Sequence, residues 1–196
     1  MTDDLIRIIL TFSSGSVLLL WVITVTTSSY NLKEWIKRLT VLKLNTLVVI
    51  VLETIISLQL LKFIEFEIPN VTNKIVLSVS GLIIHISGAL IAAWAKVTMK
   101  ASWGAPAQHD IKKQKNLVTS GPFKYTRNPI YLGLLMMFLG LEFALRSYLM
   151  LLTVPIYYLM LKAIKIEEKL LEKHFDKSYL DYKKKVSRFL PIFIKN

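Results

Sequence analysis

The sequence contains no cysteine among its 196 residues, and only 3 residues are histidine. The absence of cysteine excludes disulfides, thiolate catalysis, cysteine-ligated zinc and iron–sulfur clusters. So few histidines leave little scope for a histidine-built metal centre, and we expect no bound metal. Only 19% of the residues are charged and 54% are hydrophobic, whereas a soluble domain is about one quarter charged. The composition therefore excludes both a soluble globule and a disordered chain.

Most of the hydrophobic residues fall into five runs, at about 5–29, 39–64, 71–95, 129–145 and 147–165. At about 1.5 Å per helical residue, each of the first three can cross a hydrocarbon layer about 30 Å thick. The first run could instead be a signal peptide, but Asp3 and Asp4 stand where a basic segment would be expected. The last two runs are short and almost contiguous, which predicts a tight helical hairpin whose second helix is kinked at Pro155.

The chain is thus predicted to be an all-α integral membrane protein with about five transmembrane helices. We expect a single membrane domain over residues 1–196. Its first part, 1–95, would hold three spans, and its second part, 96–196, would hold a cytoplasmic loop, the hairpin and a C-terminal amphipathic helix.

Basic residues alternate between the two sides of these spans. One side carries few of them, namely Arg7, Lys62, Lys74 and Arg146. The other side collects Lys33, Lys37 and Arg38, then Lys96, Lys100, Lys112, Lys113, Lys115, Lys124 and Arg127, and finally the lysine-rich tail after residue 165. Because cytoplasmic loops are enriched in Lys and Arg, the N-terminus is predicted outside and the C-terminus in the cytoplasm. The net charge of +12 then points to an anionic membrane surface before nucleic acid.

Two ionisable residues, Glu53 and His85, lie in the middle of the second and third spans. Ionisable groups are costly in hydrocarbon, so both are expected to face the bundle interior, where they could meet. Such a pair could handle protons or substrate, or it could be a buried hydrogen bond that fixes helix register. Near the other end of the bundle, Glu142 and Arg146 are four residues apart, which predicts a salt bridge within a helix.

The segment from Gln108 to Tyr131 is polar, contains a Ser-Gly-Pro turn and leads back into the membrane at Asn128-Pro129. Proline suits the first turn of a helix, and Asn128 is predicted to cap it. The helix start could bind an anion through its free backbone N–H groups, or it could be an ordinary cap.

Two further features follow the fifth run. Glu167 and Glu168 are adjacent carboxylates in a basic region, and they could bind a ligand or neutralise nearby lysines. Beyond them Tyr179, Tyr182 and Val186 recur at helical spacing among lysines, with Phe189 next on the same face. This stripe predicts a helix that lies on an anionic bilayer. Nucleic acid is the alternative partner for such a pattern, but five spans argue against it.

These segments together resemble the isoprenylcysteine carboxyl methyltransferase family, within the wider integral-membrane methyltransferase group that includes phospholipid N-methyltransferases. The resemblance covers about Trp103 to Pro191. It rests on Leu117-Val118-Thr119-Ser120-Gly121-Pro122-Phe123, on Arg127-Asn128-Pro129-Ile130-Tyr131, on Glu167-Glu168, and on Phe175-x-x-x-Tyr179-x-x-Tyr182 with Arg188-Phe189-Leu190-Pro191.

The resemblance implies an enzyme that uses S-adenosyl-L-methionine at the cytoplasmic interface and methylates a lipidic acceptor from the bilayer. Its cofactor contacts would fall on Gln108, Asn116, Leu117, Val118, Phe123, Asn128, Pro129, Ile130, Tyr131 and Glu167. Arg127, Asn128 and Tyr131 would position the reactants. The chain has no G-x-G-x-x-G motif after a strand, which excludes a Rossmann-type cofactor site.

Two departures from the family pattern bear on the acceptor. The usual Arg-His-Pro-x-Tyr contains Asn128 in place of histidine, a form similar to the phospholipid N-methyltransferase branch. The arginine that the family places near the substrate carboxylate falls on Ala163, and Lys162 or Lys165 could substitute for it. Carboxyl O-methylation of an isoprenylcysteine-like molecule is the first expectation, and phospholipid or small-amine N-methylation is the alternative. A non-catalytic membrane binding or scaffold protein, or a transporter, is the alternative of another class.

Overall fold

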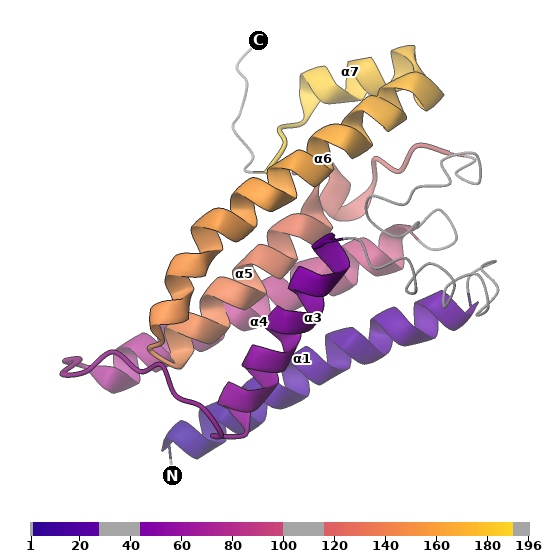
Figure 1. Ribbon diagram of the computed structural model, residues 1–196. Coiled ribbons are helices and arrows are strands. Elements are labelled where there is room, and N and C mark those ends of the chain that lie inside the picture. Colours follow the sequence, from indigo (N-terminus) through magenta and orange to yellow (C-terminus); the bar gives the residue numbers. More distant parts are fainter. Residues whose placement is uncertain (1, 28–43, 100–115, 190–196) are drawn as a thin grey trace.

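The structure, a computed structural model, describes residues 2–27, 44–99 and 116–189. These residues form six α-helices and two 3-10 helices. The α-helices are α1 (Thr2–Thr27), α3 (Leu44–Leu60), α4 (Lys74–Met99), α5 (Pro129–Ala144), α6 (Thr153–Phe175) and α7 (Lys177–Lys185), and the 3-10 helices are η3 (Gly121–Lys124) and η4 (Tyr148–Leu152). The described residues contain no strand, only an isolated bridge between Glu67 and Ser147. The all-α prediction is confirmed (Figure 1).

Two helical segments among the described residues are long and apolar enough to cross a membrane, Lys74–Met99 and Tyr148–Phe175. The helix α5 has 16 residues and spans only about 24 Å. The arrangement of five spans therefore stays a prediction. Residues 28–43, which contain the basic residues predicted to face the cytoplasm after the first span, lie outside the described part of the chain. Residues 100–115, most of the predicted basic loop, also lie outside it.

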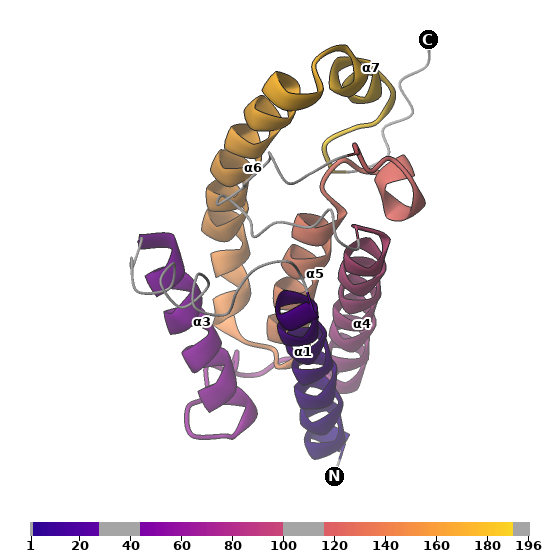
Figure 2. The same ribbon diagram turned by 90° about the vertical axis from the view of Figure 1, so that its right-hand side faces the viewer.

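The α4–α5 pair forms the centre of the molecule, and small residues let the two backbones touch. A Cβ atom added to Gly140 would lie 2.3 Å from the backbone nitrogen of His85, and one added to Gly81 would lie 2.2 Å from that of Ala144. The helix α1 packs on this pair through Ile6 and Leu10, and α6 lies on the other side of α5 (Figure 2). The small-residue stripe on α4 is thus a helix-packing surface.

His85 is buried between helices, and both of its ring nitrogens have hydrogen-bond partners. Its Nδ1 lies 2.8 Å from the Met137 carbonyl oxygen, and its Nε2 lies 3.5 Å from the Ser14 hydroxyl. Glu53 is exposed on α3. The prediction that His85 faces the bundle interior is confirmed, but its predicted pairing with Glu53 is wrong, because the histidine binds α1 and α5 instead.

We call the end of the bundle where α5 turns into η4 the Arg146 end. The guanidinium of Arg146 donates to Asp3 Oδ2 at 3.1 Å, to Glu67 Oε1 at 3.0 Å and to the Ser78 hydroxyl. Glu142 accepts a hydrogen bond from the side-chain amide of Gln59 at 2.9 Å. The predicted Glu142–Arg146 salt bridge is wrong, because each of the two side chains has partners on other segments.

The helix α6 continues ten residues beyond the end predicted for the fifth run. Pro155 lies in its first turn, where a proline requires no kink. Because α6 continues to Phe175, the pair Glu167–Glu168 lies within the helix, with all of α7 beyond it (Figure 1).

Candidate functional site

The start of α5 is bound to the segment that follows α7. The backbone N–H of Arg127 donates to the Ser187 carbonyl at 2.9 Å. The Thr126 hydroxyl and the Asn128 side-chain amide both donate to the Arg188 carbonyl, at 2.9 and 3.1 Å. Asn128 holds the N-cap position, but its side chain makes no capping hydrogen bond. The predicted positions of Asn128 as N-cap and of Pro129 as the first helical residue are confirmed, but the Asn128 amide binds the C-terminal segment instead of capping the helix.

Glu168 is the centre of a buried ion-pair cluster at this end, which we call the Glu168 end. Its carboxylate is 2.9 Å from Nη2 of Arg127 and 2.7 Å from Nη2 of Arg188. The Arg127 Nη1 group also donates to the carbonyls of Lys183 and Val186, at 3.0 and 2.6 Å. The hydrogen bond to Glu168 raises the pKa of Arg188. One carboxylate thus joins α6, the start of α5 and the segment after α7.

Glu167 lies one residue away and faces a different neighbour. The Tyr131 hydroxyl donates to Glu167 Oε1 at 2.8 Å, and only 8% of the glutamate is exposed. The hairpin of α5 and α6 thus brings Glu167 beside the start of α5. Cofactor binding by these residues stays a prediction. Tyr131 thus orients the carboxylate of Glu167. The neighbouring carboxylate, that of Glu168, is already bound by two arginines.

The aromatic stripe of the C-terminal helix packs inside the protein. Tyr179, Tyr182 and Val186 form a buried cluster, against which Leu117 and Phe175 pack. The Tyr182 hydroxyl donates to the Phe123 carbonyl at 2.7 Å, and burial raises the pKa of both tyrosines. The prediction that this stripe lies on the bilayer is wrong, because it holds η3 and the 116–118 segment against α6 and α7.

Phe189, the last member of the predicted stripe, is separate from this cluster. Its ring packs against Tyr157 of α6 with centroids 5.6 Å apart. The segment after α7 is therefore held to α6 by an aromatic contact as well as by the Arg188–Glu168 pair.

The 3-10 helix η3 is held against the end of α4. Gly121 has φ +58°, and an added Cβ would lie 2.7 Å from the Thr98 hydroxyl. Only glycine suits this conformation and this close approach. The Ser-Gly-Pro turn predicted from the sequence thus places η3 beside α4.

The remaining candidate residues differ in burial. Phe123, Asn128 and Pro129 are buried, Val118 and Ile130 are half-buried, Asn116 is exposed, and Gln108 lies outside the described residues. The two candidate acceptor-binding residues, Lys162 and Lys165, are both exposed. At about 100° per residue, Lys165 points about 160° away from Glu167 around α6.

Sequence reasoning missed two buried groups. Thr126, which ties the start of α5 to Arg188, is 4% exposed, and Lys96 is 2% exposed on α4. The four-residue spacing Gly88, Ala92, Lys96 on the buried stripe of α4 was the available signal for the lysine. For Thr126 no local signal existed, since its partner is 62 residues away. The described residues hold no cluster of three or more His, Asp or Glu side chains suited to a metal ion.

Comparison with known proteins identifies the family. Residues 76–178 match the profile of the phospholipid methyltransferase family. The chain belongs to this family. It is also 32% identical, over 140 residues, to a Xenopus laevis protein named protein-S-isoprenylcysteine O-methyltransferase. The match covers 68% of this chain and 48% of the relative, so the chain spans about half the length of that relative. The family match includes α4, α5, α6, the Tyr131–Glu167 contact and the Glu168 side of the ion-pair cluster.

Proposed function

We propose that this membrane protein transfers a methyl group from S-adenosyl-L-methionine to a lipidic acceptor at the Glu168 end. The observation that carries the proposal is the Tyr131–Glu167 contact, which joins two motif segments of a methyltransferase family in one place. A non-catalytic scaffold role would require no oriented carboxylate at that point.

The residues at this end suit the chemistry of the cofactor. S-adenosyl-L-methionine presents ribose hydroxyls, an amino group and a cationic sulfonium, and it supplies an activated methyl group when bound. Glu168 is bound by two arginines, and the Tyr131 hydroxyl holds the carboxylate of Glu167 beside the start of α5. Glu167 would supply the negative charge that such a cation requires. The start of α5 would provide the apolar wall through Pro129 and Ile130.

The protein contributes positioning to this reaction. Methyl transfer is an in-line displacement, so alignment and exclusion of water supply much of the rate. The Arg127–Glu168–Arg188 cluster fixes the start of α5 relative to α6, and Tyr131 fixes the carboxylate of Glu167. A carboxylate acceptor needs no base, whereas an amine acceptor must lose a proton. Glu168 is occupied by two arginines, so Glu167 or water would accept that proton.

We take carboxyl O-methylation of an isoprenylcysteine-like molecule as the first candidate reaction, because the relative named above bears that activity in its name. N-methylation of a phospholipid or a small amine is the second candidate, and the family description favours it. Asn128 does not decide between them, since its amide binds the Arg188 carbonyl.

Calorimetric titration of S-adenosyl-L-methionine into the purified protein tests the cofactor site. Glu167→Gln removes a charge-assisted acceptor worth about 1.5–3 kcal/mol, so affinity should fall roughly ten- to a hundredfold. Tyr131→Phe, which leaves the charge but frees its orientation, should cause a smaller loss. The matched control is Glu172→Gln, since that glutamate on the same helix pairs with Lys183. Equal affinities in all four proteins would overturn the site, and no binding by the wild type would favour the scaffold role.

The acceptor is identified by methylating lipid extracts with isotope-labelled cofactor and analysing the products by mass spectrometry. A methyl ester releases labelled methanol in mild alkali, whereas an N-methyl product is stable. Alkali-labile label in a prenylated product supports O-methylation, and stable label in a headgroup amine supports the second candidate.

We further propose that the Glu168 end faces the cytoplasm and that the N-terminus lies outside, because Lys and Arg collect on the former side. The chain lacks cysteine, so single cysteines at positions 3 and 184 can be labelled selectively in intact cells with an impermeant reagent. We expect reaction at position 3 and none at 184. The reverse pattern contradicts this topology.

A further inference from the structure

The outward face of α6 carries a stripe of lysines that the proposed reaction does not use. We call it the lysine stripe, and it consists of Lys162, Lys165, Lys169 and Lys173. All four side chains are exposed. At about 100° per residue their directions fall within about 80° of one another, and they extend over about 16 Å of helix. The arrangement therefore forms one continuous basic surface.

The carboxylates of α6 do not neutralise this stripe. Glu168 binds two arginines, Glu172 pairs with Lys183, and Glu167 receives the Tyr131 hydroxyl. Within the part of the chain that the structure describes, none of the four lysines forms an ion pair or a side-chain hydrogen bond. The stripe is thus a surface of uncompensated positive charge.

Exposed apolar side chains lie directly beside the lysine stripe. Leu159, Ile166 and Leu170 are 46%, 54% and 37% exposed. Viewed along the axis of α6, these three side chains point about 80° away from the centre of the lysine stripe. They lie on the side of the stripe that is away from Ile164, which is fully buried. The apolar and basic strips therefore face outward together, as in helices whose apolar side enters the acyl region while lysines reach the headgroups.

We propose that the lysine stripe binds the headgroups of anionic lipids in the leaflet at the Glu168 end, with Leu159, Ile166 and Leu170 in contact with their acyl chains. Charge complementarity selects this occupant, because four clustered lysines attract an anionic membrane surface. Because α6 is part of the candidate membrane span Tyr148–Phe175, the stripe lies close to the membrane. This assigns Lys162 and Lys165 to the bilayer, although they were candidates for binding the acceptor.

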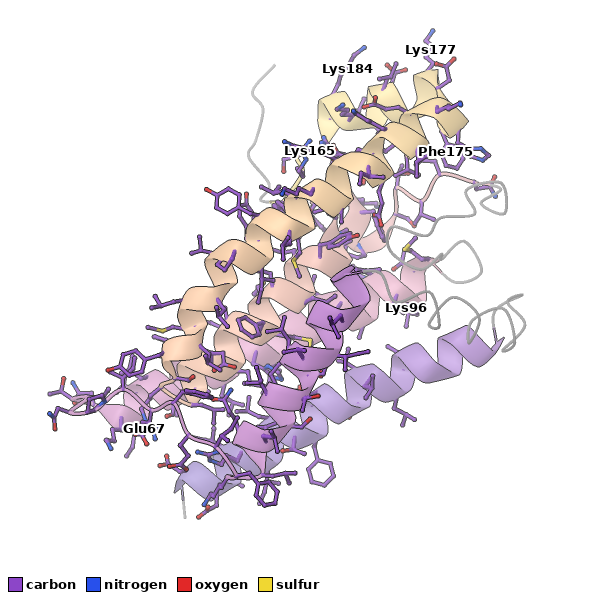
Figure 3. All side chains as sticks on the ribbon, viewed as in Figure 1. Glu67, Lys96, Lys165, Phe175, Lys177 and Lys184 are labelled. Carbon is purple, nitrogen blue, oxygen red and sulfur yellow. The ribbon has the colours of Figure 1, made fainter. Side chains whose placement is uncertain are left out.

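The lysines of α7 provide a matched comparison within the same chain. Lys177, Lys184 and Lys185 are also exposed. Figure 3 shows Lys177 and Lys184 at the far tip of the molecule and Lys165 on the flank of α6. The α7 group has three lysines, of which Lys184 pairs with Asp181 at 3.4 Å, and only the α6 group adjoins exposed apolar side chains on a candidate membrane span.

Lipid-selective fluorescence quenching tests the proposal with the full chain in vesicles. A fluorophore is attached to Leu170→Cys in the cysteine-free protein, and quenching by brominated phosphatidylglycerol is compared with quenching by brominated phosphatidylcholine. Attraction of one lysine to an anionic surface corresponds to roughly a fivefold preference. We therefore expect local enrichment of the anionic lipid by roughly fivefold or more, and we expect high salt to reduce it.

Three controls make the outcome specific. Replacing the four lysines of the stripe by glutamine should lower the enrichment to about onefold, whereas Lys177→Gln with Lys184→Gln and Lys185→Gln should preserve most of it. A probe at Ile83→Cys, which is exposed on the apolar face of α4, should show no preference. Thermal unfolding of each variant verifies that it is folded. Equal quenching by both lipids at position 170, or loss of enrichment in the α7 variant alone, overturns the proposal.

Discussion

Each end of the molecule has a cluster of ion pairs, and the two clusters have opposite arrangements of charge. At the Arg146 end, one arginine is shared by two carboxylates, those of Asp3 and Glu67. At the Glu168 end, one carboxylate is shared by two arginines. The two carboxylates at the Arg146 end have side chains that are 58% and 35% exposed, whereas Glu168 and Arg127 are only 5% and 8% exposed. We expect similar contacts to stabilise the two ends by different amounts, because burial determines whether a group that loses its partner can be hydrated.

The largest effect should come from Glu168→Gln. This change leaves Arg127 buried without its counter-charge, which typically costs about 3–5 kcal/mol. The measurement is the free energy of unfolding in detergent, with Glu172→Gln as the control, since that pair is partly exposed and should cost under about 1 kcal/mol. If both variants unfold like the wild type, burial does not distinguish the ion pairs.

The effect of Arg146→Gln should be smaller. The two carboxylates that lose their partner can be hydrated, so the main cost is the loss of charge-assisted hydrogen bonds, about 1–3 kcal/mol. The same unfolding measurement applies. If Arg146→Gln lowers the free energy of unfolding as much as Glu168→Gln does, the two ends do not differ in how burial affects their ion pairs.

Acid should reveal the smallest effect, through Glu67. Burial alone would raise the pKa of Glu67, but hydrogen bonds from Arg146 and Lys74 outweigh it and lower that pKa. A carboxyl group with a lowered folded pKa adds stability above its unfolded pKa of about 4.3, and that stability is lost as the pH falls through the folded value. Because Glu67 is partly exposed, the contribution should be about 0.5–1 kcal/mol. Glu67→Gln should therefore destabilise at pH 6 and converge with the wild type near pH 3.

The helices could be predicted from the sequence because hydropathy is a local property. The runs at 71–95 and 129–145 correspond closely to α4 and α5. The end of α6 could not be predicted in this way, since hydropathy marks where apolar residues stop. The Lys and Glu residues that follow are good helix formers, and α6 continues through them.

The contact between Tyr131 and Glu167 could be predicted because a hairpin returns the chain to the same depth. The partners of Glu168 could not, since Arg127 and Arg188 are 41 and 20 residues away. For the same reason the four-residue spacing of Glu142 and Arg146 predicted the wrong pair. Spacing along a helix shows which local contacts are possible. Here tertiary packing brought Gln59 to Glu142 and Glu67 to Arg146, and these contacts replaced the local pair.

The glycine contacts between α4 and α5 have a mechanical consequence. At Gly81, Gly88, Gly133 and Gly140 the two backbones leave no space for a single methyl group, so a sliding motion of one helix along the other would drive backbone into backbone. The α4–α5 pair is therefore expected to move as one rigid unit. The helix α6 is tied at its far end, by Glu168 to Arg127 and by Glu167 to Tyr131. Any opening of the Glu168 end would therefore have to break these polar contacts, because the α4–α5 pair leaves no room for movement along its own axis.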